Sequence, residues 1–99
     1  MRSCIEFPKE GLTRLCEANH IRRLSVFGSA LRPDFGPDSD VDVLVEFEPG
    51  ETVGLRIVRI ERDLSALVGR DVDLRTPNEL SRYFRDRVMR EAEPHYVRS

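Results

Sequence analysis

The clearest secondary-structure signal in the chain is the period-two pattern from Asp40 to Phe47, in which valine or phenylalanine stands at every second position. Side chains two residues apart in a β-strand point to the same side, so this segment predicts a strand with one apolar and one polar face. The apolar face carries Val41, Val43, Val45 and Phe47. The other face carries Asp40, Asp42, Leu44 and Glu46.

Two shorter segments also have strand character. Residues Leu24–Phe27 contain two β-formers and end abruptly at Gly28, which predicts a short strand closed by a turn. Residues 71–75 alternate again, with Val72 and Leu74 on the inward side. We therefore expect three strands.

Apolar residues at helical spacing predict three helices, over about 8–19, over about 53–68, and from Thr76 toward Pro94. The last of these begins with Thr76-Pro77-Asn78-Glu79, a capping box with proline at the first helical position. The second helix separates two strands, so those strands should be parallel and joined by a right-handed crossover. The order predicts an α/β (α+β) fold, a small mixed sheet with helices on one face, in a single domain spanning residues 1–99.

The composition narrows the functional classes. A chain of 99 residues has a thin core, which favours a partner chain or self-association. The charged fraction is 34% but the net charge is only −2, so no strong nucleic-acid binding is expected.

No apolar run is long enough to span a membrane, and residues 1–9 lack the apolar stretch of a signal peptide, so we expect a cytoplasmic protein. Cys4 and Cys16 stand alone, without a CxxC motif or a Cys/His cluster, so we expect both thiols to be reduced.

Three aspartates suggest a metal site. Asp40 and Asp42 lie two apart on one strand face, with Cα atoms roughly 6.6 Å apart. Carboxylates at this spacing can converge on two Mg²⁺ ions about 3.5–4 Å from each other. Asp73 can reach the same ions if its strand pairs beside the first, and it could also accept the proton of an attacking hydroxyl.

The turn after the first strand suggests a phosphate site. Glycine at Gly28 allows the backbone to approach a ligand, and successive N–H groups there can cradle phosphate. The Ser29 hydroxyl adds a donor, and Arg32 can neutralise phosphate charge.

Each of these signals has a simpler interpretation when taken alone. A Gly-Ser pair is usually just a turn, and Asp38 and Asp40 could belong to a solvated loop. The series Asp38-x-Asp40-x-Asp42 superficially matches a calcium loop. That match fails because Val43 occupies the position of the sharp-turn glycine and Pro49 the position of the bidentate glutamate.

The joint pattern is more specific than its parts. Phe27-Gly28-Ser29 is followed after ten residues by Asp40-Val41-Asp42, and a helix later by Val72-Asp73-Leu74. This order resembles the nucleotidyltransferase superfamily that includes DNA polymerase β. Phe27-Gly28-Ser29-x-x-Arg32 and the run 37–45 further resemble its minimal nucleotidyltransferase (MNT) branch, from about Leu12 to the chain end.

The resemblance implies a function. MNT proteins are often antitoxins encoded beside a helical HEPN ribonuclease toxin, and some transfer AMP from ATP to a tyrosine of that toxin. Carried onto this chain, the nucleotide would be held by Gly28, Ser29, Arg32 and Ser39. Magnesium binding and catalysis would fall to Asp40, Asp42 and Asp73.

Three hypotheses follow from these residues together with the resemblance. The first is Mg²⁺-dependent transfer of AMP from ATP to a protein hydroxyl. The second is an antitoxin that acts by binding alone, with a weak or vestigial active site. It is favoured by Ala30, where many relatives carry a basic residue, and Pro33 in place of their glycine makes the loop stiffer. The three aspartates argue against it, because carboxylates that converge without a metal repel one another. The third is a nucleotidyltransferase acting on an antibiotic, which would normally need a second domain or subunit for the acceptor.

Overall fold

The structure is a computed structural model that describes residues 7–28, 40–50 and 54–98. Its elements in chain order are α1 (Lys9–Ala18), β1 (Ile21–Phe27), β2 (Val41–Phe47), α2 (Arg56–Val68), β3 (Val72–Arg75), the 3₁₀ turn η2 (Pro77–Glu79), α3 (Arg82–Glu91) and β4 (Glu93–Val97). The four strands form one sheet in the order β3-β2-β1-β4. Strands β2 and β3 are parallel, whereas β1 is antiparallel to both β2 and β4. The predicted mixed α+β fold is confirmed.

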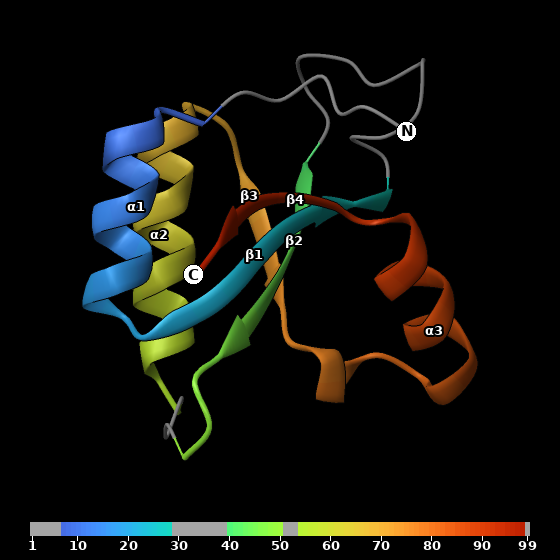
Figure 1. Ribbon diagram of the computed structural model, residues 1–99. Helices are drawn as coiled ribbons and strands as arrows, with labels where there is room; N and C mark the ends of the chain where they lie inside the picture. The colour runs from blue at the N-terminus through green and yellow to red at the C-terminus, as the bar shows by residue number, and fades with distance from the viewer. Residues whose placement is uncertain (1–6, 29–39, 51–53, 99) are drawn as a thin grey trace.

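One face of the sheet packs against α1 and α2 (Figure 1). The alternating valines of β2 are fully buried there, as their spacing predicts. They meet Ile60 and Leu64 of α2, both of which are also fully buried. The longest described helix, α2, has 13 residues, and no described helix is both long and apolar enough to cross a membrane.

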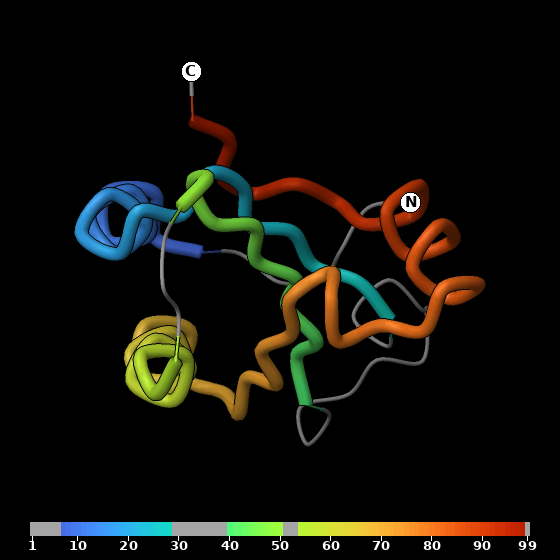
Figure 2. Tube along the Cα trace, turned by 90° about the horizontal axis from the view of Figure 1, so that it is seen from below, coloured from blue at the N-terminus to red at the C-terminus, as the bar shows by residue number. Residues whose placement is uncertain are grey.

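Helix α3 lies on the opposite face of the sheet, so the prediction that all helices cover one face is wrong (Figure 2). The reason is a second apolar cluster on that face. Phe27 and Leu44 point away from α1 and α2, and they are covered by Leu80 and by Val88 of α3. Burying these side chains on folding is favourable, so the chain places a helix over them.

Helix α2 also closes the outer edge of β3. The Val72 N–H donates to Ser65 Oγ at 3.0 Å, and the Leu74 N–H donates to Glu61 Oε2 at 2.9 Å. Unpaired backbone groups on an edge strand invite pairing with another chain. Two side chains of α2 therefore take the place of a further strand and fix β3 against the helix.

The buried thiol of Cys16 belongs to the first apolar cluster. Cys16 is a free cysteine with no exposed surface, and burial raises its pKa to about 12. Because the thiolate is the reactive form, this side chain serves packing rather than chemistry. Cys4 lies outside the described residues.

The last helix begins five residues later than its capping box predicts. Residues 77–79 form a single 3₁₀ turn without a side-chain cap from Thr76. Leu80 then takes an extended conformation that brings it into the second apolar cluster, and Ser81 caps α3 by accepting a hydrogen bond from the Phe84 N–H at 3.4 Å. Burial of Leu80 thus breaks the helix that the local pattern favours.

The strand β4 was not predicted from the sequence. Pro94 was expected to end the last helix, but it lies inside β4, which pairs with β1 at the edge of the sheet. Proline is tolerated in an edge strand because its missing N–H need not face a neighbouring strand. The helix instead ends at Glu91, with Ala92 as its cap.

A pair of alanine substitutions tests where α3 begins. Ser81→Ala should lower the free energy of unfolding by about 0.5–1 kcal/mol, because it removes the cap of α3. Thr76→Ala should change it by a few tenths at most, since Thr76 makes no capping hydrogen bond. Urea unfolding of both variants decides the matter. A larger loss for Thr76→Ala would mean that the helix starts at the capping box.

Candidate active site at the shared end of three strands

Strand directions bring three chain segments together at one end of the sheet. Strand β1 runs antiparallel to β2, and β3 runs parallel to β2. The end of β1 therefore lies beside the beginnings of β2 and β3, at the top of Figure 1. Gly28 follows β1 and Asp40 precedes β2, so both are delivered to this end.

Asp42 and Asp73 are direct neighbours across the parallel pair. The register matches Asp42 with Asp73, and Asp42 also lies opposite Phe27 of β1. Both aspartates are half-buried, and both alternate with side chains of the α2-packed core. Their carboxylates consequently leave the sheet on the face away from α1 and α2, as the alternation of both strands predicts.

Asp40 and Asp73 both line a groove along the outer edge of β3. This groove has a volume of about 500 Å³. Its strand side includes Asp40, Asp71 and Asp73, and its helix side includes Glu61, Arg62 and Ser65. Asp73 therefore pairs with Asp42 in the register and shares this groove with Asp40.

Gly28 holds the end of β1 against Asp42. Its φ of +69° lies in the left-handed region, which favours glycine. A Cβ atom at this position would overlap Oδ2 of Asp42 and lie 3.3 Å from its Cγ. The close approach of backbone and carboxylate therefore requires a residue without a side chain, and this explains the glycine of the motif physically.

Arg75 forms an ion pair with Asp73 that the sequence did not predict. Its two terminal nitrogens lie 3.1 Å from the two carboxylate oxygens of Asp73. The alternation of residues 71–75 predicts that Arg75 lies on the same face as Asp73, but it does not predict that the two side chains form an ion pair. A bidentate arginine–carboxylate pair orients both side chains strongly.

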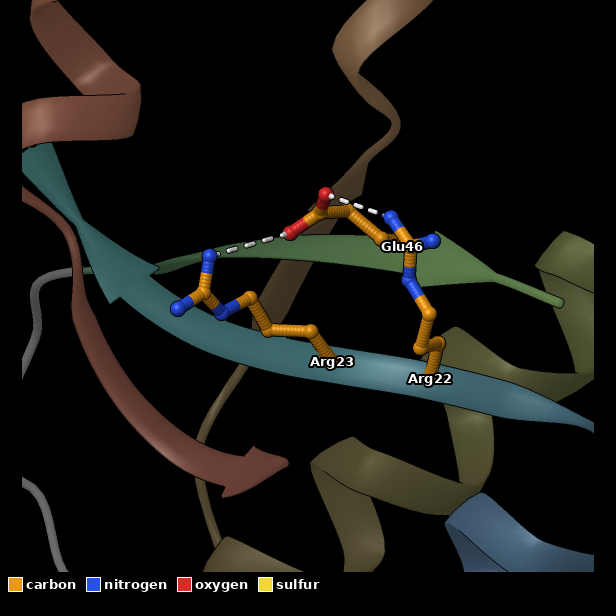
Figure 3. Close-up of polar contacts among 3 residues, drawn as sticks. All are labelled: Arg22, Arg23 and Glu46. Atoms are coloured by element: carbon orange, nitrogen blue, oxygen red, sulfur yellow. Dashed lines mark hydrogen bonds and ion pairs between the residues drawn. The ribbon is translucent and has the colours of Figure 1, made fainter. Parts of the chain in front are cut away.

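A different carboxylate of β2 is already neutralised by arginines. Glu46 lies four residues after Asp42, and Figure 3 shows it between Arg22 and Arg23 of β1. The nearest nitrogen–oxygen distances are 3.4 Å to Arg22 and 3.9 Å to Arg23. With its side chain only 13% exposed, Glu46 is held in a structural ion pair at the far end of the strand.

The donor set suits magnesium together with a substrate. Within 7–28, 40–50 and 54–98 there is no preformed cluster of three or more histidine, cysteine, aspartate or glutamate residues able to hold a metal. Magnesium, however, usually takes one or two carboxylates and completes its shell with water and substrate phosphates. The register neighbours Asp42 and Asp73, with Asp40 nearby, offer such a set. Ser29, Arg32 and Ser39 lie outside the described residues, as do Ala30 and Pro33.

A glycine turn packed against an aspartate strand, with a further aspartate on the parallel neighbour, defines a nucleotidyltransferase. The nucleotidyltransferase domain family matches residues 8–95, and the chain belongs to this family. The resemblance to its minimal nucleotidyltransferase branch is confirmed by individual relatives.

Two relatives are assigned as protein adenylyltransferases. MJ0435 of Methanocaldococcus jannaschii is 38% identical over 72 residues, which are 73% of this chain and 76% of that protein. MntA of Thermococcus cleftensis is 39% identical over 71 residues, or 72% of this chain and 71% of that protein.

Solved structures share the fold. A structure described as a minimal nucleotidyltransferase superposes with a TM-score of 0.72 at 38% identity, covering 87% of each chain. A toxin–antitoxin complex with AMP-PNP superposes with a TM-score of 0.71 at 17% identity, covering 92% of this chain and 74% of that one. At this low identity, the second similarity concerns the fold alone.

Proposed function

We propose that this protein transfers AMP from ATP to a protein hydroxyl, a tyrosine of a partner HEPN-type toxin, and that it thereby acts as an antitoxin. The observation that carries the proposal is the pairing of Asp42 with Asp73, with Gly28 packed against Asp42. Relatives assigned as protein adenylyltransferases support the reaction type. Structures of the same fold from MntA–HepT toxin–antitoxin complexes support the kind of partner.

The residues of the site have separate tasks in this reaction. Asp40, Asp42 and Asp73 would hold one or two Mg²⁺ ions. When bound, Mg²⁺ supplies charge neutralisation at the transferring phosphate and the leaving group. The backbone after β1, from Gly28 to Ser29, would receive the triphosphate, since consecutive N–H groups there can bind anionic oxygens.

The proposed transfer is an in-line displacement at the α-phosphorus of ATP. The tyrosine oxygen forms a bond to the α-phosphorus, the bond from that phosphorus to the bridging oxygen of the β-phosphate breaks, and pyrophosphate leaves. The hydroxyl proton passes to a carboxylate, for which Asp73 is the candidate because of its place beside Asp42. Arg32 and Ser39 are proposed to contact the nucleotide.

A second candidate function is neutralisation of the toxin by binding alone. The ion pair between Arg75 and Asp73 favours it, because a carboxylate occupied by arginine is less open to a metal. The two functions differ in one product, the modified tyrosine, and they can be separated in a single experiment.

That experiment combines the protein, ATP, Mg²⁺ and the product of the neighbouring gene, followed by intact-mass analysis of the partner. We expect the partner to gain one adenylyl group on a tyrosine and to lose its ribonuclease activity. Asp42→Asn should leave the partner unmodified while still co-purifying with it. Inhibition of the ribonuclease without any change in mass would instead establish neutralisation by binding.

A further inference from the structure

The ion pair between Arg75 and Asp73 joins a candidate metal ligand to a cation on its own strand. We propose that Arg75 is a positioning residue that occupies Asp73 until a divalent cation and a nucleotide replace it together. Arg75 would thus make metal binding depend on nucleotide binding. This inference rests on the proposed function, because it takes Asp73 to be a metal ligand.

In the absence of metal, Arg75 holds the Asp73 carboxylate in one orientation. Both guanidinium contacts to Asp73 measure 3.1 Å, so the carboxylate is held through both oxygens. Asp73 lies beside Asp42 in the register, and like charges on neighbouring strands repel. The guanidinium offsets this repulsion and fixes the direction in which the Asp73 carboxylate points.

The pair is also built so that it can open. The side chains of Arg75 and Asp73 are 47% and 38% exposed, so solvent screens their attraction. Exposed ion pairs contribute little to stability, and a divalent cation competes for the same carboxylate oxygens with twice the charge. By contrast, Glu46 in the other pair is only 13% exposed, and Arg22 and Arg23 both approach it (Figure 3).

Arg75 is affected differently when a metal alone takes its place at Asp73 and when a metal and a nucleotide do so together. A metal that takes Asp73 by itself leaves the guanidinium without its carboxylate. A metal that arrives with a triphosphate also brings phosphate oxygens, which arginine binds well through its fork of N–H donors. Arg75 therefore penalises metal binding without nucleotide more than metal binding with it. By linkage, it also makes nucleotide binding more dependent on metal.

The test measures Mn²⁺ binding to the protein from the loss of the electron paramagnetic resonance signal of the free ion, with and without ATP, after subtraction of the Mn²⁺ that the same concentration of ATP binds in the absence of protein. Arg75→Gln should bind Mn²⁺ alone about two- to fivefold more tightly than wild type, the range expected for loss of an exposed competing ion pair. The further tightening caused by ATP should be smaller in Arg75→Gln than in wild type. Arg22→Gln is the matched control, because it removes the same charge from the ion pair with Glu46.

The possible outcomes distinguish failure of this inference from failure of the proposed function. Equal Mn²⁺ affinity and an equal ATP effect in wild type and Arg75→Gln would overturn the role of Arg75 and leave the proposed transfer intact. Absence of Mn²⁺ binding in every protein, even with ATP, would overturn both. Arg75→Lys retains the charge without the bidentate fork and should fall between wild type and Arg75→Gln. It provides the same comparison if Arg75→Gln does not fold.

Discussion

Replacing Asp42 with asparagine is expected to slow AMP transfer by about 10²–10³-fold or more, the range seen when one preorganised charge-stabilising group is removed from an active site. Asparagine keeps the size of the side chain but loses the charge that a metal needs. Single-turnover transfer at saturating ATP measures the effect. Asp63→Asn, the same substitution on the exposed side of α2, should transfer at the wild-type rate.

The melting temperature of Asp42→Asn should respond to Mg²⁺ and ATP differently from that of wild type. In the metal-free protein, Arg75 offsets part of the repulsion between the register neighbours Asp42 and Asp73, so Asp42→Asn should change the melting temperature little. Wild type should gain stability when Mg²⁺ and ATP are added, because they bind the native state, and Asp42→Asn should not. An equal gain in both proteins would mean that Asp42 is not a ligand.

Gly28→Ala should reduce transfer by about 10²-fold, because a misplacement of about 1 Å in a catalytic group can cost that much. The new methyl group would overlap the Asp42 carboxylate and force it out of place. The left-handed backbone at φ +69° adds a cost of roughly 1–2 kcal/mol in stability. Single-turnover transfer and urea unfolding of the same variant measure the two effects separately.

Gly69→Ala is the control that separates backbone strain from collision. Gly69 has a φ of +71°, nearly that of Gly28, but a Cβ atom there would meet nothing within 4 Å. It should therefore lose a similar amount of stability and retain transfer activity. If both variants lost activity equally, backbone strain would explain the effect, and the contact with Asp42 would have no part in it.

Local periodicity was enough to determine the half of the fold that carries the aspartates. Alternation in β2 and β3 depends only on the strand geometry of consecutive residues, so the polar faces of Asp42 and Asp73 could be assigned without a structure. The helix between the two strands has room to return the chain, and it predicted their parallel pairing. The nucleotidyltransferase motif followed from order and spacing, which a sequence displays directly.

Contacts between distant segments were decided only by the tertiary structure. Whether Leu80 continues a helix or breaks it depends on the apolar cluster with Phe27 and Leu44, which lie at least 36 residues earlier in the chain. Strand β4 exists because β1 offers it an edge, and its own sequence, with Pro94, gives only a weak strand signal. In the same way, spacing placed Arg75 on the face of Asp73, but only side-chain conformation brings the two together. Short-range pattern determines which way a side chain faces, and packing against remote residues determines what it touches.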